Sequence, residues 1–188
     1  MSSILNGTAN VLHKTKLPAG ATREQGVAML HDHAFYLSCD PHLVKQSELK
    51  PDDARVKDAA PPPPPERVAS AAVAGRARRF YEVHDLVHNL PGGLWDSNVV
   101  STNEITDIEA GLFVRIRSPM AVVMDTFWEI RAVEGEEGAW ELVEEITISA
   151  SRLIVGLVKS LCEGGWEKIH EKMMERLKAE LAAKKAAA

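Results

Sequence analysis

The chain has 188 residues, 45% of them hydrophobic, and a formal net charge of −5, which is the balance of one globular domain. No dominant basic patch is present, which argues against nucleic acid and anionic membrane surfaces as partners. Two cysteines do not make a disulfide framework, and residues 1–14 lack the pattern of a secretory signal. The most apolar stretch, 112–130, contains Arg115, Arg117 and Asp125, so we expect no membrane span and a reducing, cytoplasmic location.

The first 50 residues predict a strand, two short helices and a second strand. Residues 4–16 have strand character, and Thr22 and Gln25 have the spacing of a helix capping box. We expect the two helices to meet near His31-Asp32-His33 and the second to end before Pro41, since proline disfavours helix in the residue before it. Residues 42–49 follow as a short strand.

A proline-rich insertion follows at residues 51–77. Its five consecutive prolines cannot enter a helix or an inner strand, so we expect an elongated loop inside one domain that spans 1–188. A second interpretation stays open, in which this loop is a ligand for a proline-binding partner.

Short alternating segments separated by turns then predict an antiparallel meander. The expected strands are 80–88, 97–108, 112–117, 121–133 and 140–149. A long helix capped by Ser151 ends the chain, and its apolar stripe recurs every four residues: Leu157, Leu161, Gly165, Ile169, Met173, Leu177 and Leu181. Gly164 and Gly165 each cost this helix about 1 kcal/mol relative to alanine, which close approach of the sheet, a bend or room for a ligand would have to compensate.

This order of elements, across nearly the whole chain, resembles the helix-grip fold of the START/birch-pollen-allergen-like (SRPBCC) superfamily. The stretch from YEVHDLVH to ELVEEITISA looks most like uncharacterised fungal members. The resemblance implies an α+β fold in which a curved, seven-stranded antiparallel sheet wraps a long C-terminal helix and two short helices close one end. It also implies a cavity for lipids, polyketides, hormones or aromatic metabolites. Members range from lipid-transfer proteins to aromatase/cyclases without a shared catalytic motif, and the proline-rich insertion departs from the common pattern.

Strand alternation assigns a few polar side chains to the face that meets the helix: Tyr81, Asp85, Ser101, Asn103, Thr126 and Glu144. Desolvation raises the pKa of a carboxyl group in an apolar cavity and makes it a usable acid or base near neutral pH. Asp85 is the first candidate and Glu144 the second, while Tyr81 and Asn103 could donate hydrogen bonds to a carbonyl or enolate oxygen. Two structural interpretations stay open: Asp85 as a carboxylate bonded to backbone at a strand end, and Glu144 moved to solvent by a one-residue register slip.

The expected ligand contacts combine this polar set with apolar walls and a mouth. His33, Tyr36 and Trp95 are assigned to the mouth, and the walls are assigned to Leu112, Val114, Met124, Trp128, Leu161, Ile169 and Met173. Such an aromatic and methionine stripe is more often plain core than a ligand site. The expectation of a cavity therefore rests on the resemblance alone.

No motif indicates a metal or a cofactor. His84 and His88 are four residues apart on a strand, which separates them by about 13 Å, and no His-Glu-x-x-His spacing occurs. Surface or loop positions are therefore favoured for these histidines and for His31 and His33. No Gly-x-Ser-x-Gly elbow and no phosphate-binding loop after a strand is present.

The expected function is therefore a cofactor-free one of secondary metabolism. The chain would enclose a polyketide-, terpenoid- or lipid-like molecule and assist its cyclisation, isomerisation or dehydration by acid/base chemistry. Two alternatives stay open: a non-catalytic carrier or sensor of lipids or metabolites, and an interaction domain that recruits partners through its polyproline loop. A homodimer is compatible with the sequence, which leaves the oligomeric state open.

Overall fold

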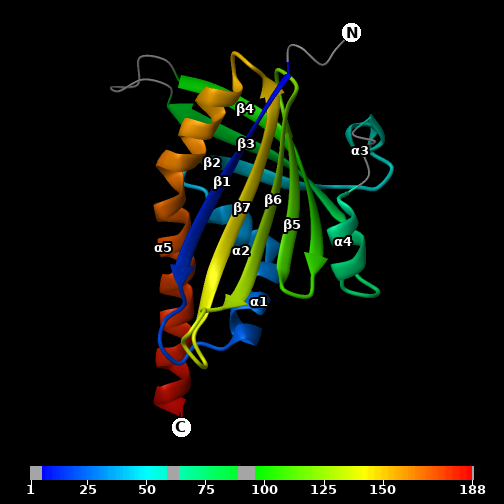
Figure 1. Cartoon of the computed structure of the whole chain (residues 1–188). Helices are drawn as coiled ribbons and strands as arrows, with labels where there is room; N and C mark the ends of the chain where they lie inside the picture. The colour runs from blue at the N-terminus through cyan, green and yellow to red at the C-terminus, as the bar shows by residue number, and fades with distance from the viewer. Residues whose placement is uncertain (1–5, 59–63, 89–95, 188) are drawn as a thin grey trace.

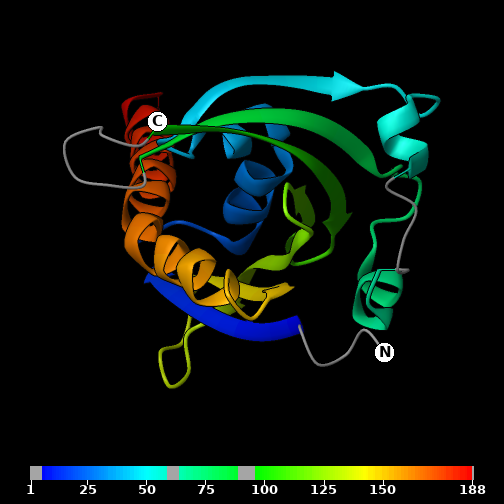
Figure 2. The same cartoon turned by 90° about the horizontal axis from the view of Figure 1, so that it is seen from above.

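The computed structural model describes residues 6–58, 64–88 and 96–187. Seven antiparallel strands form one sheet in the order β1-β7-β6-β5-β4-β3-β2. The strands are β1 Asn6–Lys16, β2 Leu43–Leu49, β3 Arg79–His88, β4 Asp96–Ile108, β5 Gly111–Ser118, β6 Val122–Ala132 and β7 Trp140–Ser151. The sheet curves strongly, as Figures 1 and 2 show, and the long helix α5 (Val155–Ala187) lies along its open side. This arrangement confirms the predicted α+β helix-grip fold.

Two short helices, α1 (Arg23–His31) and α2 (His33–Ser38), follow β1 as expected. Thr22 and Gln25 form the predicted capping box, because each side chain accepts a hydrogen bond from the backbone N–H of the other. The Asp32 side chain caps α2 by accepting from the N–H of Phe35. These caps fix the joint between the helices and place both beneath the concave face of the sheet (Figure 2).

The proline-rich insertion differs from the expected loop because it contains helical turns. It includes α3 (Ala54–Asp58) and α4 (Glu66–Ala71), while residues 59–63 lie outside the described part. Proline is tolerated at a helix start, where its missing N–H is not needed, and Pro65 is the residue before α4. Val68 of α4 packs with Ile108 and Phe113 on the convex face, so this insertion covers part of the outside of the sheet.

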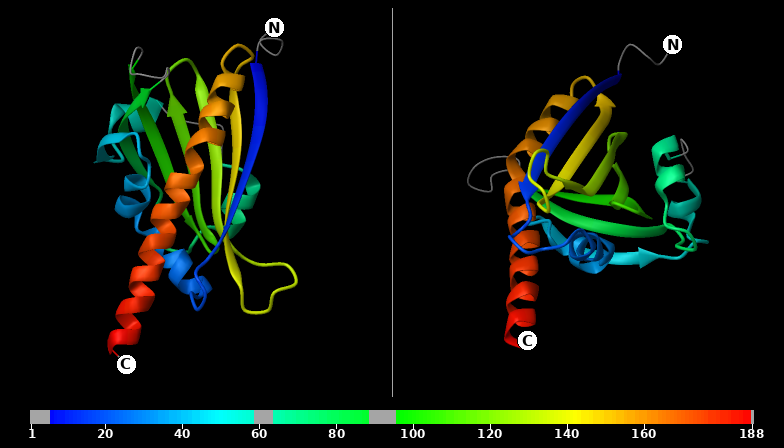
Figure 3. Two further views of the ribbon diagram at one scale, coloured as in Figure 1. Left: turned by 90° about the vertical axis from the view of Figure 1, so that its left-hand side faces the viewer. Right: turned by 60° about the horizontal axis from the view of Figure 1, so that its bottom comes forward.

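The helix α5 begins later than predicted. Ser151 belongs to β7, and its carbonyl accepts a hydrogen bond from the N–H of Ile154 in a turn that precedes the helix. From Val155 the helix crosses the open side of the sheet and extends past its lower edge (Figure 3). No helix of the described ranges is both long and apolar enough to cross a membrane.

Side chains fill one end of the space between sheet and helix. Met173 and Leu177 of α5 are fully buried against Met29 and Leu30 of α1 and against inward-facing strand residues such as Leu112. The N-terminal half of α5 differs, because Leu157 and Leu161 remain partly exposed and no buried cluster of that size lies beneath them. The core is therefore dense at the lower end of the sheet, and the pocket described next lies toward the upper end.

Candidate functional site

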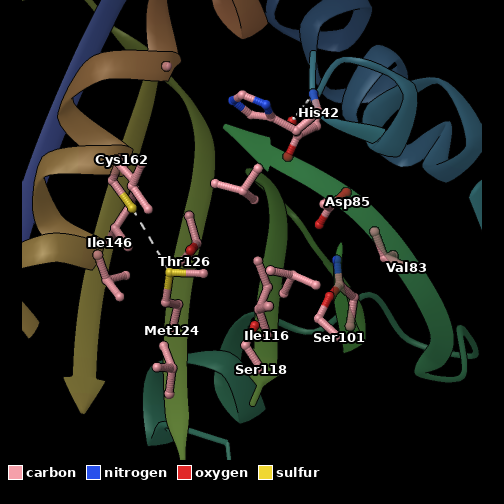
Figure 4. A pocket seen from close by; sticks show the side chains of 18 of the residues that line it. His42, Val83, Asp85, Ser101, Ile116, Ser118, Met124, Thr126, Ile146 and Cys162 are labelled. Atoms are coloured by element: carbon pink, nitrogen blue, oxygen red, sulfur yellow. Dashed lines mark hydrogen bonds between the residues drawn. The ribbon is translucent and has the colours of Figure 1, made fainter. Parts of the chain in front are cut away.

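A pocket of about 430 Å³ lies between the concave face of the sheet and the N-terminal half of α5 (Figure 4). The strands β3 to β7, the helix α5 and the segment that joins α2 to β2 supply its walls. Most lining residues are apolar: Val83, Val87, Val99, Ile116, Val122, Met124, Trp128, Ile146, Ile154, Leu157, Val158, Leu161, Trp166 and Ile169 are among them. An apolar ligand that enters this pocket would gain about 25 cal/mol for each Å² of apolar surface removed from water.

Gly165 keeps space free on the helix side of the pocket. A β-carbon at this position would meet no atom within 4 Å, and the same is true of Gly164, which is exposed and does not line the pocket. Close approach of the sheet therefore does not explain the two glycines. For Gly165 the structure instead shows room in the pocket, which was one of the three compensations considered.

The mouth of the pocket lies where lining residues are also exposed. Leu157 and Leu161 of α5 are 55% and 41% exposed, and Met120 of the β5–β6 turn is 69% exposed. Met120 and Ala121 both adopt the left-handed backbone region, which costs a non-glycine residue on the order of 1 kcal/mol. The strained backbone of this turn thus places the apolar side chain of Met120 beside the opening of the pocket.

Asp85 is the carboxyl group of the pocket that has an oxygen without a hydrogen-bond partner. Its Oδ1 atom is buried and has no hydrogen-bond partner, and Figure 4 shows the side chain projecting from β3 into the pocket. Burial, together with the charge of the neighbouring Asp40, raises the pKa of Asp85 to about 6, and His42 and His84 oppose the rise. A carboxyl group with this pKa can both donate and accept a proton near neutral pH.

A second polar group lies on β7, where Glu144 meets two buried histidines. Nδ1 of His13 lies 2.7 Å from Oε2 of Glu144, within hydrogen-bonding distance, and Nε2 of His170 lies 3.6 Å from the same oxygen. The His13 ring stacks on Trp166 with 4.6 Å between ring centroids. Thr15 Oγ1 lies 2.8 Å from Nδ1 of His170 and orients that ring. Glu144 therefore lines the pocket with a carboxyl group that is already hydrogen-bonded within the protein.

Many of the residues assigned to the site from the sequence line this pocket. They are Tyr36, Asp85, Ser101, Asn103, Met124, Thr126, Trp128, Glu144, Leu161 and Ile169. Tyr36 and Trp128 meet edge to face with 5.4 Å between ring centroids, and Trp128 Nε1 makes no hydrogen bond of normal geometry. Glu144 faces inward, in the register that the alternation gave.

Five other assigned residues do not line the pocket: His33, Tyr81, Leu112, Val114 and Met173. All five are buried in the filled end of the core. Trp95 lies outside the described residues.

The polar side chains in the filled end are bonded to one another. His33 was expected at the surface or the mouth, but it is buried between Tyr81, whose hydroxyl group lies 3.1 Å from Nδ1, and Asp107, whose Oδ1 lies 2.7 Å from Nε2. Arg76 binds the other oxygen of Asp107 at 2.6 Å. This network occupies the Tyr81 hydroxyl group and leaves it turned away from the pocket.

Sequence reasoning missed the partners that surround the two pocket acids. Asp40 and His42 come from the α2–β2 connection, where Asp40 accepts a hydrogen bond of 2.7 Å from the N–H of His42. His13 and His170 come from β1 and α5, far from Glu144 in sequence. A histidine on the inward face of each element was the only available signal, and it does not reveal which carboxyl group the ring meets.

Both thiols are free and chemically quiet. Burial raises the pKa of Cys39 to about 11 and that of Cys162 to about 12. Cys162 lines the pocket, and its Sγ atom lies 3.9 Å from the sulfur of Met124. The nucleophilic thiolate form of both cysteines is therefore scarce at neutral pH.

The raised pKa of Asp85 predicts a pH-dependent cost to stability. Because the unfolded state ionises near the usual pKa of 3.8 and the folded state only near 6, wild-type stability should fall as pH rises between these values. Above pH 6, Asp85→Asn should therefore be more stable than wild type by about 1–2 kcal/mol, a value that allows for the partial exposure of Asp85 to solvent. Near pH 4 the two proteins should have nearly the same free energy of unfolding. Denaturant unfolding of both proteins across this range measures the difference. A constant difference at all pH values would show that Asp85 titrates normally.

Comparison with solved structures places the fold among helix-grip proteins. The chain matches the Zhui aromatase/cyclase of Streptomyces sp. R1128 with a TM-score of 0.62 and 12% identity, over 93% of this chain and 96% of that one. It matches a START superfamily protein of Mycobacterium smegmatis with a TM-score of 0.57 and 13% identity, over 92% and 99%. It matches Ara h 8.0201 with a TM-score of 0.51 and 10% identity, over 92% and 99%. These likenesses confirm the fold that the resemblance implied.

At the level of sequence, the chain matches a family model. No curated protein matches the chain. A family model described as a domain of unknown function, DUF7053, matches residues 6–179, which include every described strand and most of α5. The chain therefore belongs to the DUF7053 family.

Proposed function

We propose that this protein binds a hydrophobic small molecule in the pocket and assists its cyclisation, isomerisation or dehydration by cofactor-free acid/base chemistry. The observation that supports this best is a largely apolar pocket of about 430 Å³ with one unpaired carboxyl oxygen, Asp85 Oδ1, buried in its wall. Pockets of this size and character hold small organic molecules. The structural likeness to an aromatase/cyclase is consistent with the proposal but shows the fold alone.

Asp85 is the proposed acid/base group, because burial brings its pKa to about 6. Asn103 and Ser101 are on the neighbouring strand β4, with Ser101 donating to Asn103 at 3.1 Å, and they are placed to orient a polar group of the ligand. Glu144 is the proposed second polar contact. Tyr81 is assigned no chemistry, since its hydroxyl group is bonded to His33 outside the pocket.

The test starts from the purified full chain. Small molecules extracted from it with organic solvent are identified by mass spectrometry and returned to wild type and to Asp85→Asn. We expect wild type to convert the bound metabolite or its direct precursor to an isomer or a dehydrated product, and the variant, once saturated with the same molecule, to react about 100-fold more slowly. Binding without conversion by wild type would overturn the catalytic part and leave a carrier.

A further inference from the structure

The pocket is lined by three carboxyl groups, and among its described lining residues only His42 can carry a positive charge. Asp40, Asp85 and Glu144 line it, whereas no lysine or arginine does among the described residues. The segments outside the described ranges contain no lysine or arginine in the sequence either. Nearby basic side chains are engaged elsewhere: Lys172 donates to the carbonyl of Ser38, and Arg176 pairs with Asp32 and Glu180.

The three carboxyl groups are not equivalent. Glu144 has His13 at 2.7 Å and His170 at 3.6 Å. Asp40 accepts a single backbone hydrogen bond, from His42. Asp85 has a buried oxygen without any hydrogen-bond partner, although Asp40 is near enough to act on it electrostatically. At the Asp40–Asp85 wall, Asp85 Oδ1 therefore remains without a donor, and the one lining residue beside it that can carry a positive charge is His42, whose Nδ1 lies 3.2 Å from the carbonyl oxygen of Leu86.

The aromatic wall of the pocket, formed by Tyr36, Trp128 and Trp166, needs a hydrogen-bond acceptor and not a donor. Trp128 is 3% exposed, and its buried indole N–H, which lies near the Tyr36 hydroxyl group, makes no hydrogen bond of normal geometry, so it can donate to an acceptor on a bound molecule. Tyr36, Trp128 and Trp166 supply flat apolar surface beside it. A ligand that satisfies both walls carries a donor cation at one end and an unsaturated or oxygen-bearing body at the other.

We propose that the ligand of this pocket is a hydrophobic amine, whose ammonium group binds between Asp40 and Asp85 while its apolar body lies against Trp128 and Trp166. An ammonium group supplies both the hydrogen bond that Asp85 Oδ1 lacks and a positive charge beside the two carboxyl groups. A carboxylate such as a fatty acid would meet two carboxyl groups with only His42 beside them, which disfavours it. The inference rests on the proposed binding function but not on catalysis.

Three probes of matched shape test the charge preference: naphthylethylamine, naphthylethanol and naphthylacetate. Each displaces the neutral dye N-phenylnaphthylamine from the full chain at neutral pH, and displacement constants are compared. We expect the amine to bind at least about tenfold more tightly than the alcohol, because a buried charge-assisted hydrogen bond is worth that much, and the carboxylate to bind most weakly.

Two variants locate the preference. Asp85→Asn should bring the amine to within about twofold of the alcohol, whereas Glu171→Gln, an exposed position on α5 outside the pocket, should change the binding of neither probe. Equal binding of all three probes, or tightest binding of the carboxylate, would overturn the amine inference while leaving the proposed binding function intact. An amine preference that survives in Asp85→Asn would overturn the placement at this wall. Failure of the dye and all probes to bind would overturn both proposals.

Discussion

Gly165→Phe should abolish ligand binding while leaving the fold intact. The new ring would start from a β-carbon that meets nothing within 4 Å and would extend into the space that a ligand occupies. Replacing a mid-helix glycine also favours the helix by up to about 1 kcal/mol, so stability should not fall through loss of helix propensity. Titration with N-phenylnaphthylamine should show binding weakened at least about tenfold.

The neighbouring glycine provides the control. Gly164 has the same open surroundings but is exposed and does not line the pocket. Gly164→Phe adds the same ring to the same helix, one residue away and facing solvent, and should bind the dye like wild type. If both variants bind normally, the ligand does not lie beside Gly165. If both lose binding, the effect arises from the helix and not from occupation of the pocket.

Glu144→Ala should cost more stability than any other single change considered above. The Glu144 side chain is 6% exposed and bonded at 2.7 Å to His13, which is buried and stacked on Trp166. Removing the carboxyl group leaves that ring nitrogen without its partner and opens a small cavity, which together cost about 2–4 kcal/mol. Guanidinium unfolding at neutral pH measures the loss.

Glu141 on the same strand gives a matched comparison. It pairs with Lys14 at 2.9 Å, but the lysine side chain is half exposed to solvent, so Glu141→Ala should cost under about 1 kcal/mol. Equal losses in the two variants would mean that the His13–Glu144 contact contributes no more than a surface ion pair. A cycle with His13→Ala would then separate the pair energy from the cavity.

The fold was predictable because its signals are local. Alternation along β6 and β7 assigns Trp128 and Glu144 to the concave face, and the capping box at Thr22 sets the start of α1. A single period of two per strand, together with turns of a few residues, leaves an antiparallel meander as the simplest arrangement. The late start of α5 was missed because a serine suited to capping precedes a turn that only tertiary packing selects.

The site was predictable in part because alternation gives the face of a residue but not its depth along the strand. Tyr81 and Asp85 share a face of β3 and are separated by about 13 Å, yet one lies in the filled core and the other in the pocket. Which end is filled depends on α1 and the second half of α5, and the contact between His13 and Glu144 depends on pairing of β1 with β7 across 131 residues. Neither follows from local pattern.

The fungal likeness, the single-domain assignment, the cytoplasmic location and the homodimer stay predictions from the sequence. The absence of a cofactor likewise belongs to the proposed function. The described structure brings three features together at one site: an apolar pocket, Gly165, which leaves space in it, and Asp85, whose Oδ1 atom has no hydrogen-bond partner.

Native mass spectrometry of the purified full chain tests the central claim most directly. We predict one noncovalent small-molecule adduct per chain, removable by organic solvent, present in Gly164→Phe and absent from Gly165→Phe. A bare protein mass in every preparation, together with no saturable binding of N-phenylnaphthylamine to wild type, would contradict a ligand-binding pocket between the sheet and α5.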